Sequence, residues 1–130
     1  MFTIEQIKVA HAKVKSGADF PAYIRDLKTL GVRFYEAYVT DGHIDYYGEG
    51  EEKKAAGAKY QPLVVADVAD AAAFERILRE HQQGGSDYLT FCRLCGEYGV
   101  EKWAVCLEKM TCTYYDKAGN MLLEEAIPTV

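Results

Sequence analysis

Four cysteines offer the most recognisable chemistry in the sequence. Cys92 and Cys95 form a C-x-x-C pair, and Cys106 and Cys112 follow further along the chain. Four thiolates can hold zinc in a tetrahedral site, and a C-x-x-C pair alone can act as a redox centre. A free cysteine in a protein core behaves instead as a small hydrophobic residue. Which of these three roles applies depends on where the helices and strands place the thiols.

Histidine and tyrosine supply the other candidates. His11, His43 and His81 could act as ligands or general bases near neutral pH. Ten tyrosines outnumber the five phenylalanines and the single tryptophan. Tyrosine combines an apolar ring with a polar tip and therefore suits half-exposed sheet faces and interfaces. The sequence contains no glycine-rich phosphate loop, nucleophile elbow or metalloprotease helix motif. Whether the protein is an enzyme stays open, and catalysis is disfavoured.

The elements that position these residues occur twice in the sequence. Residues 17–47 match residues 85–115 at a constant offset of 68 without a gap. The identical pairs are Gly17/Gly85, Asp19/Asp87, Arg25/Arg93, Gly31/Gly99, Val32/Val100, Tyr46/Tyr114 and Tyr47/Tyr115. Upstream, a slippage of two residues aligns His11 with His81. We therefore expect an internal duplication with pseudo-repeats at residues 4–66 and 74–127.

Each repeat is predicted to contain two helices followed by three strands. A capping box of Thr3 and Gln6 begins the first helix, and Gly17 ends it. Asp19 is the predicted N-cap of the second helix, and Gly31 is its C-terminal cap. The predicted strands of this half are 32–39, 43–48 and 60–66, with a mobile loop at 48–59.

The second half repeats this plan and fixes the fold class. Its predicted helices and strands are about 70–83, 87–98, 100–107, 110–115 and 120–127. The sequence thus predicts an α+β fold in one domain, residues 1–130, with about four helices covering one face of an antiparallel sheet. The two halves could join edge to edge in one sheet or pack as two small sheets.

The repeat also favours a structural role for the cysteines. The residues aligned with them are apolar or aromatic: Ile24 with Cys92, Leu27 with Cys95, Tyr38 with Cys106 and Ile44 with Cys112. Strand alternation places the last two cysteines on opposite faces of the sheet, so they could not share a metal ion. We expect reduced core thiols, no metal and no cofactor, with a redox or metal role for the C-x-x-C pair as the alternative.

Composition limits the possible partners. The net charge of −5 disfavours nucleic acid. The longest apolar run, residues 103–107, is far shorter than the roughly 18 to 20 residues that span a bilayer. The N-terminus lacks a basic segment followed by an apolar core, so the sequence predicts no signal peptide and a cytoplasmic protein.

Several segments resemble a bacterial family of about this length. They are SGADFP at 16–21, YEAYV at 35–39, DGH at 41–43, VEKW at 100–103 and MTCTYYD at 110–116. The chain resembles the domain-of-unknown-function family 1398, whose members are often described as phage-envelope-protein-like. The resemblance covers essentially the whole chain. It implies no activity, cofactor or catalytic residues, and at most an association with prophages.

Two functional hypotheses follow. The first is a non-enzymatic protein that acts through protein contacts and self-associates, with outward-facing Tyr38, Tyr47 and Tyr115 as its interface. The alternative is a ligand-binding or enzymatic domain with its site at the junction of the two repeats. The candidate residues for that site are His11, His81, Tyr47 and Tyr115. His43 follows the 41–42 turn and is expected to be a solvated loop residue.

Overall fold

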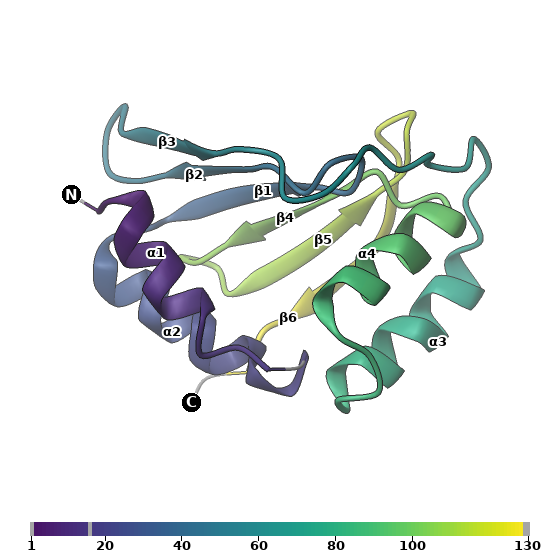
Figure 1. Ribbon diagram of the computed structural model, residues 1–130, viewed down its shortest axis with the longest axis horizontal. Coiled ribbons are helices and arrows are strands. Elements are labelled where there is room, and N and C mark those ends of the chain that lie inside the picture. The colour runs from purple at the N-terminus through teal and green to yellow at the C-terminus, as the bar shows by residue number, and fades with distance from the viewer. Residues whose placement is uncertain (1, 16, 129–130) are drawn as a thin grey trace.

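All the strands join in one sheet. The computed structural model describes residues 2–15 and 17–128. In these residues the antiparallel strand order is β3-β2-β1-β4-β5-β6, and four α-helices lie on the same side of the sheet (Figure 1). The strands are β1 (Phe34–Tyr38), β2 (Ile44–Tyr47), β3 (Lys53–Ala56), β4 (Lys102–Cys106), β5 (Thr111–Tyr115) and β6 (Met121–Ala126). The predicted α+β class is confirmed.

The helices form two pairs. The helices are α1 (Ile4–His11), α2 (Phe20–Leu30), α3 (Ala71–Gln82) and α4 (Tyr88–Glu97), with a short 3₁₀ helix η1 (Gly17–Asp19) before α2. The α1–α2 pair lies against the β1–β3 half of the sheet, and the α3–α4 pair lies against the other half (Figure 1). Each helix carries apolar side chains on the side that faces the sheet, and these side chains are buried between the helix and the sheet.

Most of the predicted caps are present. The Thr3 hydroxyl accepts a hydrogen bond from the Gln6 backbone N–H (3.1 Å), and the Gln6 side chain accepts one from the Thr3 N–H (2.9 Å). Gly31 ends α2 with a positive φ of 102°. Asp19 precedes α2 but does not cap it with its side chain, because its carboxylate accepts from the Lys15 N–H (2.9 Å).

The end of α1 differs from the prediction. The helix ends at His11, not at Gly17, because the following N–H groups tighten into turn-type bonds: Lys13 donates to Ala10 and Val14 donates to His11. Gly17 has another role. A Cβ atom built on it would lie 2.3 Å from the backbone oxygen of His81, so η1 and α3 approach so closely there that only glycine fits.

The third strand of the first half was also predicted wrongly. The strand is β3 at 53–56, inside the segment predicted to be a loop, and residues 60–66 are irregular. Pro62 has no N–H to donate to a ladder. The segment is instead held by bonds to other elements: Leu63 N–H to Thr40 O (2.6 Å), Ala66 N–H to Gly96 O (2.9 Å) and the Tyr60 hydroxyl to Val39 O (2.6 Å).

The two halves meet edge to edge along β1 and β4. In this antiparallel pair Glu36 lies opposite Ala104, the residue 68 positions later. Tyr35 lies opposite Val105, and Ala37 lies opposite Trp103, so the register is symmetric about the central pair. The local two-fold axis of this strand pair therefore passes between Glu36 and Ala104. The internal duplication of the two halves stays a prediction from the sequence.

Alternation along the central strands separates a covered face from an open one. Tyr35, Ala37 and Val39 point to the helices and are buried. Phe34, Glu36 and Tyr38 therefore point away from the helices. The core cluster beneath the helices contains side chains from both halves, including Ile24, Leu27, Phe74, Val105 and Leu107.

Candidate ligand-binding cavity

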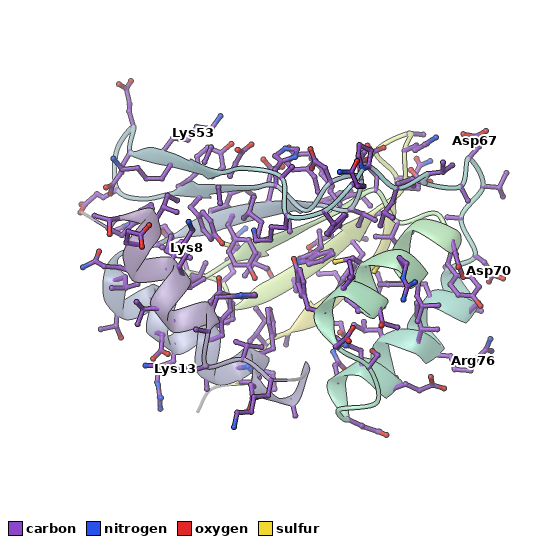
Figure 2. The ribbon with its side chains drawn as sticks, in the orientation of Figure 1. Lys8, Lys13, Lys53, Asp67, Asp70 and Arg76 are labelled. Carbon is purple, nitrogen blue, oxygen red and sulfur yellow. The ribbon has the colours of Figure 1, made fainter. Side chains whose placement is uncertain are left out.

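A cavity of about 470 Å³ lies between the two helix pairs, over the centre of the sheet. His11 and Tyr23 line it from the first half, His81 and Phe91 from the second, and Tyr35 and Trp103 from the central strands. Figure 2 shows the charged side chains of Lys13 and Arg76 at the outer sides of the helix pairs. The volume lies within the roughly 300–1,000 Å³ typical of small-molecule sites.

A continuous series of aromatic contacts connects the two histidines across the cavity wall. His11 contacts Tyr88 edge-on, with ring centroids 5.5 Å apart, and Tyr88 contacts Trp103 at 6.3 Å. Trp103 contacts Phe91 at 5.8 Å, and Phe91 stacks on His81 at 4.1 Å. Because α1, α3, α4 and β4 all contribute, the wall exists only when both halves are packed together.

The hydrogen bonds of His81 define its protonation. Its Nδ1 lies 3.1 Å from the backbone oxygen of Ser86 and 2.9 Å from the Ser86 hydroxyl. A carbonyl oxygen can only accept, so Nδ1 carries the proton and donates. In the neutral ring Nε2 is then an acceptor. Burial of the imidazole lowers the pKa of His81, which favours this neutral form at pH 7.

His11 lines the cavity from the end of α1. Its edge also contacts Tyr23, with centroids 5.3 Å apart. Burial, followed by the nearby charge of Lys59, lowers the pKa of His11, so this imidazole is also neutral at pH 7. Among the described residues, neither His11 nitrogen nor Nε2 of His81 has a hydrogen-bond partner. No described side-chain nitrogen or oxygen is both closed to solvent and unpaired, so these three atoms face accessible space.

The charged groups at the rim are already engaged or exposed. Glu125 pairs with Arg79 and accepts a hydrogen bond from Gln82 (3.0 Å). The Asp87 carboxylate caps α4 by accepting from the Thr90 N–H (2.8 Å). Lys15 is exposed to water. The part of the wall formed by the aromatic rings and the two neutral imidazoles is uncharged at pH 7.

Only two of the four predicted site residues lie at this cavity. His11 and His81 line it together, as the junction hypothesis expected. Tyr47 pairs with Phe34 across β1 and β2, and Tyr115 pairs with Lys102 across β4 and β5, which places both on the open face of the sheet. The sheet separates them from the cavity, so these two pairs of residues form no common site.

The open face has its own cluster at its centre. Lys102 forms an ion pair with Glu36 (2.9 Å) across the β1–β4 junction. The Lys102 ammonium also lies over the rings of Tyr38 and Tyr115, at 5.7 Å and 5.5 Å from their centroids. Tyr38, Tyr47 and Tyr115 thus share the outward face that strand alternation predicts.

His43 is explained by local contacts at the first hairpin. Its Nδ1 lies 2.5 Å from the Asp41 carboxylate, whose same oxygen accepts from the His43 N–H (3.0 Å). Its ring stacks on Tyr38 at 4.3 Å. These contacts stabilise the turn, which agrees with the loop role predicted for this residue.

The cysteines are free thiols. Cys92, Cys95 and Cys112 are buried, and Cys106 is partly exposed. The register places Cys106 opposite Thr111 on the open face and Cys112 opposite Val105 on the covered face, so the predicted divergence is confirmed. Burial raises the pKa of Cys92 and Cys95, and it raises the pKa of Cys112 to about 12. The three buried thiols are therefore protonated and unreactive at neutral pH.

A thiol titration of the native protein is expected to detect Cys106 alone. The other three thiols should react only after unfolding, because they are both buried and protonated. The measurement is the reaction with a chromogenic disulfide reagent before and after addition of denaturant, with C106S as the control that removes the fast reaction. Rapid native reaction of Cys92 or Cys95 would contradict the structural role assigned to them.

Comparison with known proteins places the chain in a family. Residues 8–126 match the family model described as protein of unknown function DUF1398. The chain belongs to the DUF1398 family. The predicted resemblance is therefore confirmed at the level of the family, whereas the phage-envelope description is not part of the match. No curated protein matches this DUF1398 member. In its described residues no helix is long and apolar enough to cross a membrane.

The aromatic wall of this DUF1398 member was not predicted as a site. Tyr23, Tyr35, Phe91 and Trp103 are all buried on inward faces of their elements, where a sequence cannot distinguish them from ordinary core residues. The signal that could have identified them is their number. Aromatic rings from both halves point to the region between the helix pairs. Because these rings are rigid, they cannot fill that region completely, and a cavity remains.

Proposed function

We propose that this protein binds a small molecule in the cavity between its two halves. The observation that carries the proposal is the aromatic wall that joins His11 and His81, two cavity-lining imidazoles that are neutral at pH 7. A concave apolar site with a few convergent polar groups is the usual form of a ligand site. Cys112 lines the cavity, but burial raises its pKa to about 12 and keeps the thiol protonated, so the proposal is binding without thiol catalysis.

Fluorescence of the single tryptophan tests this proposal directly. Trp103 lines the cavity, so a bound dye would lie close to it. The probe is N-phenyl-1-naphthylamine, an uncharged aromatic dye that absorbs where tryptophan emits. We expect saturable binding of one dye per chain, a dissociation constant of about 100 µM or tighter, and energy transfer from Trp103.

The control variant is W103F, which should bind the dye without tryptophan-sensitised emission. Absence of saturable binding to the folded wild-type protein would overturn the proposal. So would saturable binding that produces no energy transfer, because the dye would then lie away from the cavity.

A second candidate function uses the open face of the sheet. Tyr38, Tyr47 and Tyr115 point outward there, and Phe34 contacts Tyr47 with ring centroids 5.7 Å apart. These tyrosines are half-buried on the outward face, and tyrosine is enriched in protein interfaces, which supports self-association or a protein partner. Light scattering tests self-association, and a strict monomer over a wide concentration range would count against it. A cytoplasmic location and an association with prophages remain predictions from the sequence.

A further inference from the structure

The chemistry of the cavity wall limits the class of ligand it can take. This inference rests on the binding function proposed above and adds the identity of the group that the site recognises. The wall is built from flat rings: His11, Tyr88, Trp103, Phe91 and His81 contact one another in sequence. Flat rings present faces and edges that match another flat ring by offset stacking or edge-to-face contact. The shape therefore favours a planar aromatic molecule.

The charges favour an uncharged molecule. Burying an ion is costly unless an opposite charge and hydrogen bonds compensate it. The Glu125 carboxylate at the rim is already paired with Arg79, and Asp87 is bound to the start of α4. Lys15 is exposed and hydrated. The charged residues that line the cavity are thus either already engaged or exposed to water, and an ion buried against the aromatic wall would lack a desolvated partner of opposite charge.

The imidazoles determine the polar group. Nδ1 of His81 donates to Ser86, so Nε2 presents a lone pair to accessible space. A ligand that covers this nitrogen with a carbon atom displaces water from an acceptor and leaves it unsatisfied, which is unfavourable. A ligand that places an O–H or N–H there replaces the lost hydrogen bond. His11, with both nitrogens open, can engage a second polar group from the opposite side.

We propose that the natural ligand is an uncharged planar aromatic compound that carries a hydroxyl or ring N–H donor, of the phenol or indole class. Its ring lies along the aromatic wall, and its donor binds Nε2 of His81. No covalent step is involved, and the ligand is bound and released unchanged.

Three matched naphthalene probes test the donor requirement. The first is 2-naphthol, which is uncharged at pH 7 and has an O–H donor. The second is 2-methoxynaphthalene, in which a methyl group blocks the donor, and the third is 2-naphthoate, which is an anion. Calorimetry at pH 7 is expected to show 2-naphthol binding about tenfold more tightly than 2-methoxynaphthalene, as one additional hydrogen bond to a desolvated acceptor predicts. We expect the anion to bind most weakly.

The variant H81N separates recognition from packing. The Asn amide can still donate to Ser86, but the variant has no acceptor in the place of Nε2. The tenfold ratio between the two neutral probes should fall to about one, even if both affinities change because the ring is lost. H11F is the matched variant from the other half. This variant should lower both affinities by similar factors or reduce the ratio only in part, because no described hydrogen bond determines which His11 nitrogen donates and which accepts.

The outcomes distinguish this inference from the proposed function. Equal binding of 2-naphthol and 2-methoxynaphthalene would overturn the donor requirement and leave the binding site in place. Tightest binding of 2-naphthoate would overturn the uncharged class and indicate Lys15 as an anion contact. Retention of the tenfold ratio in H81N would show that the donor binds elsewhere. No binding of any probe to the folded protein would overturn both the inference and the proposed function.

Discussion

Replacing Gly17 with alanine is expected to lower the free energy of unfolding by about 1–3 kcal/mol, as overpacking of a close contact does. The added Cβ would lie 2.3 Å from the His81 backbone oxygen and 2.8 Å from its carbonyl carbon. These are backbone atoms of α3, so no side chain can rotate away. The same oxygen accepts from the Gly84 N–H (3.0 Å), so the end of α3 would shift with it. Urea denaturation followed by circular dichroism measures the change.

Gly57 provides the matched control for this substitution. A Cβ atom there would meet nothing within 4 Å, and its backbone is not in the left-handed region. G57A should leave stability unchanged or raise it by about 0.4–1 kcal/mol, because alanine reduces the freedom of the unfolded chain. If G17A proved as stable as the wild type, the close approach of η1 to α3 would be incorrect.

The substitution A37L is expected to weaken dye binding at least about tenfold while the protein stays folded. Ala37 lies on the cavity floor opposite Trp103 and is 1% exposed. The larger side chain would extend into the space that a ligand occupies. It should therefore reduce the affinity for the ligand more than it reduces the stability of the fold. We expect the loss of stability to stay within about 3 kcal/mol. Titration with N-phenyl-1-naphthylamine measures the affinity, and thermal unfolding confirms the fold.

A55L adds the same atoms on the opposite face of the sheet. Ala55 lies opposite Asp45 in the β2–β3 pair and is exposed. This variant should bind the dye as the wild type does. Unchanged affinity in A37L, with the fold intact, would mean that the dye binds outside the cavity.

Local sequence signals predicted most of the elements, because the residues that give these signals form the hydrogen bonds and backbone turns that begin or end each element. The Thr3 and Gln6 capping box and the Gly31 cap determine helix ends through their own hydrogen bonds and backbone angles. Strand alternation predicted the outward orientation of Tyr38 on β1 and of Tyr47 on β2. The end of α1 was predicted wrongly because Gly17 is required by a contact with His81, 64 residues away, which no local pattern contains.

The strand β3 illustrates a different limit. Its sequence, KKAA, is exposed, and lysines on an edge strand are typical of strands that avoid pairing with other chains. Hydrophobic alternation therefore cannot find it. The repeat could have found it: subtracting 68 from the bounds of β6 gives 53–58, which contains β3. In this segment the long-range similarity was more informative than the local composition.

The candidate site could be predicted only in part. The repeat related His11 to His81, and both line the cavity. Their aromatic neighbours could not be separated from ordinary core residues, because inward-facing rings look the same in a sequence whether they pack fully or border a space. Strand alternation correctly predicted that Tyr47 and Tyr115 point outward. The sheet therefore lies between these tyrosines and the histidines at the cavity.

The symmetric register of β1 and β4 has a consequence for half-length chains. Glu36 faces its own counterpart, so the edge that β1 offers is nearly self-complementary. A polypeptide that ended before residue 70 would expose this edge and could cover it with a second molecule of itself. The recess between the helix pairs would then belong to a homodimer, with each subunit contributing one wall. In the present chain, covalent linkage allows the two walls to differ: the His81 imidazole is held by hydrogen bonds to Ser86, whereas the His11 imidazole packs edge-on against Tyr23 and Tyr88.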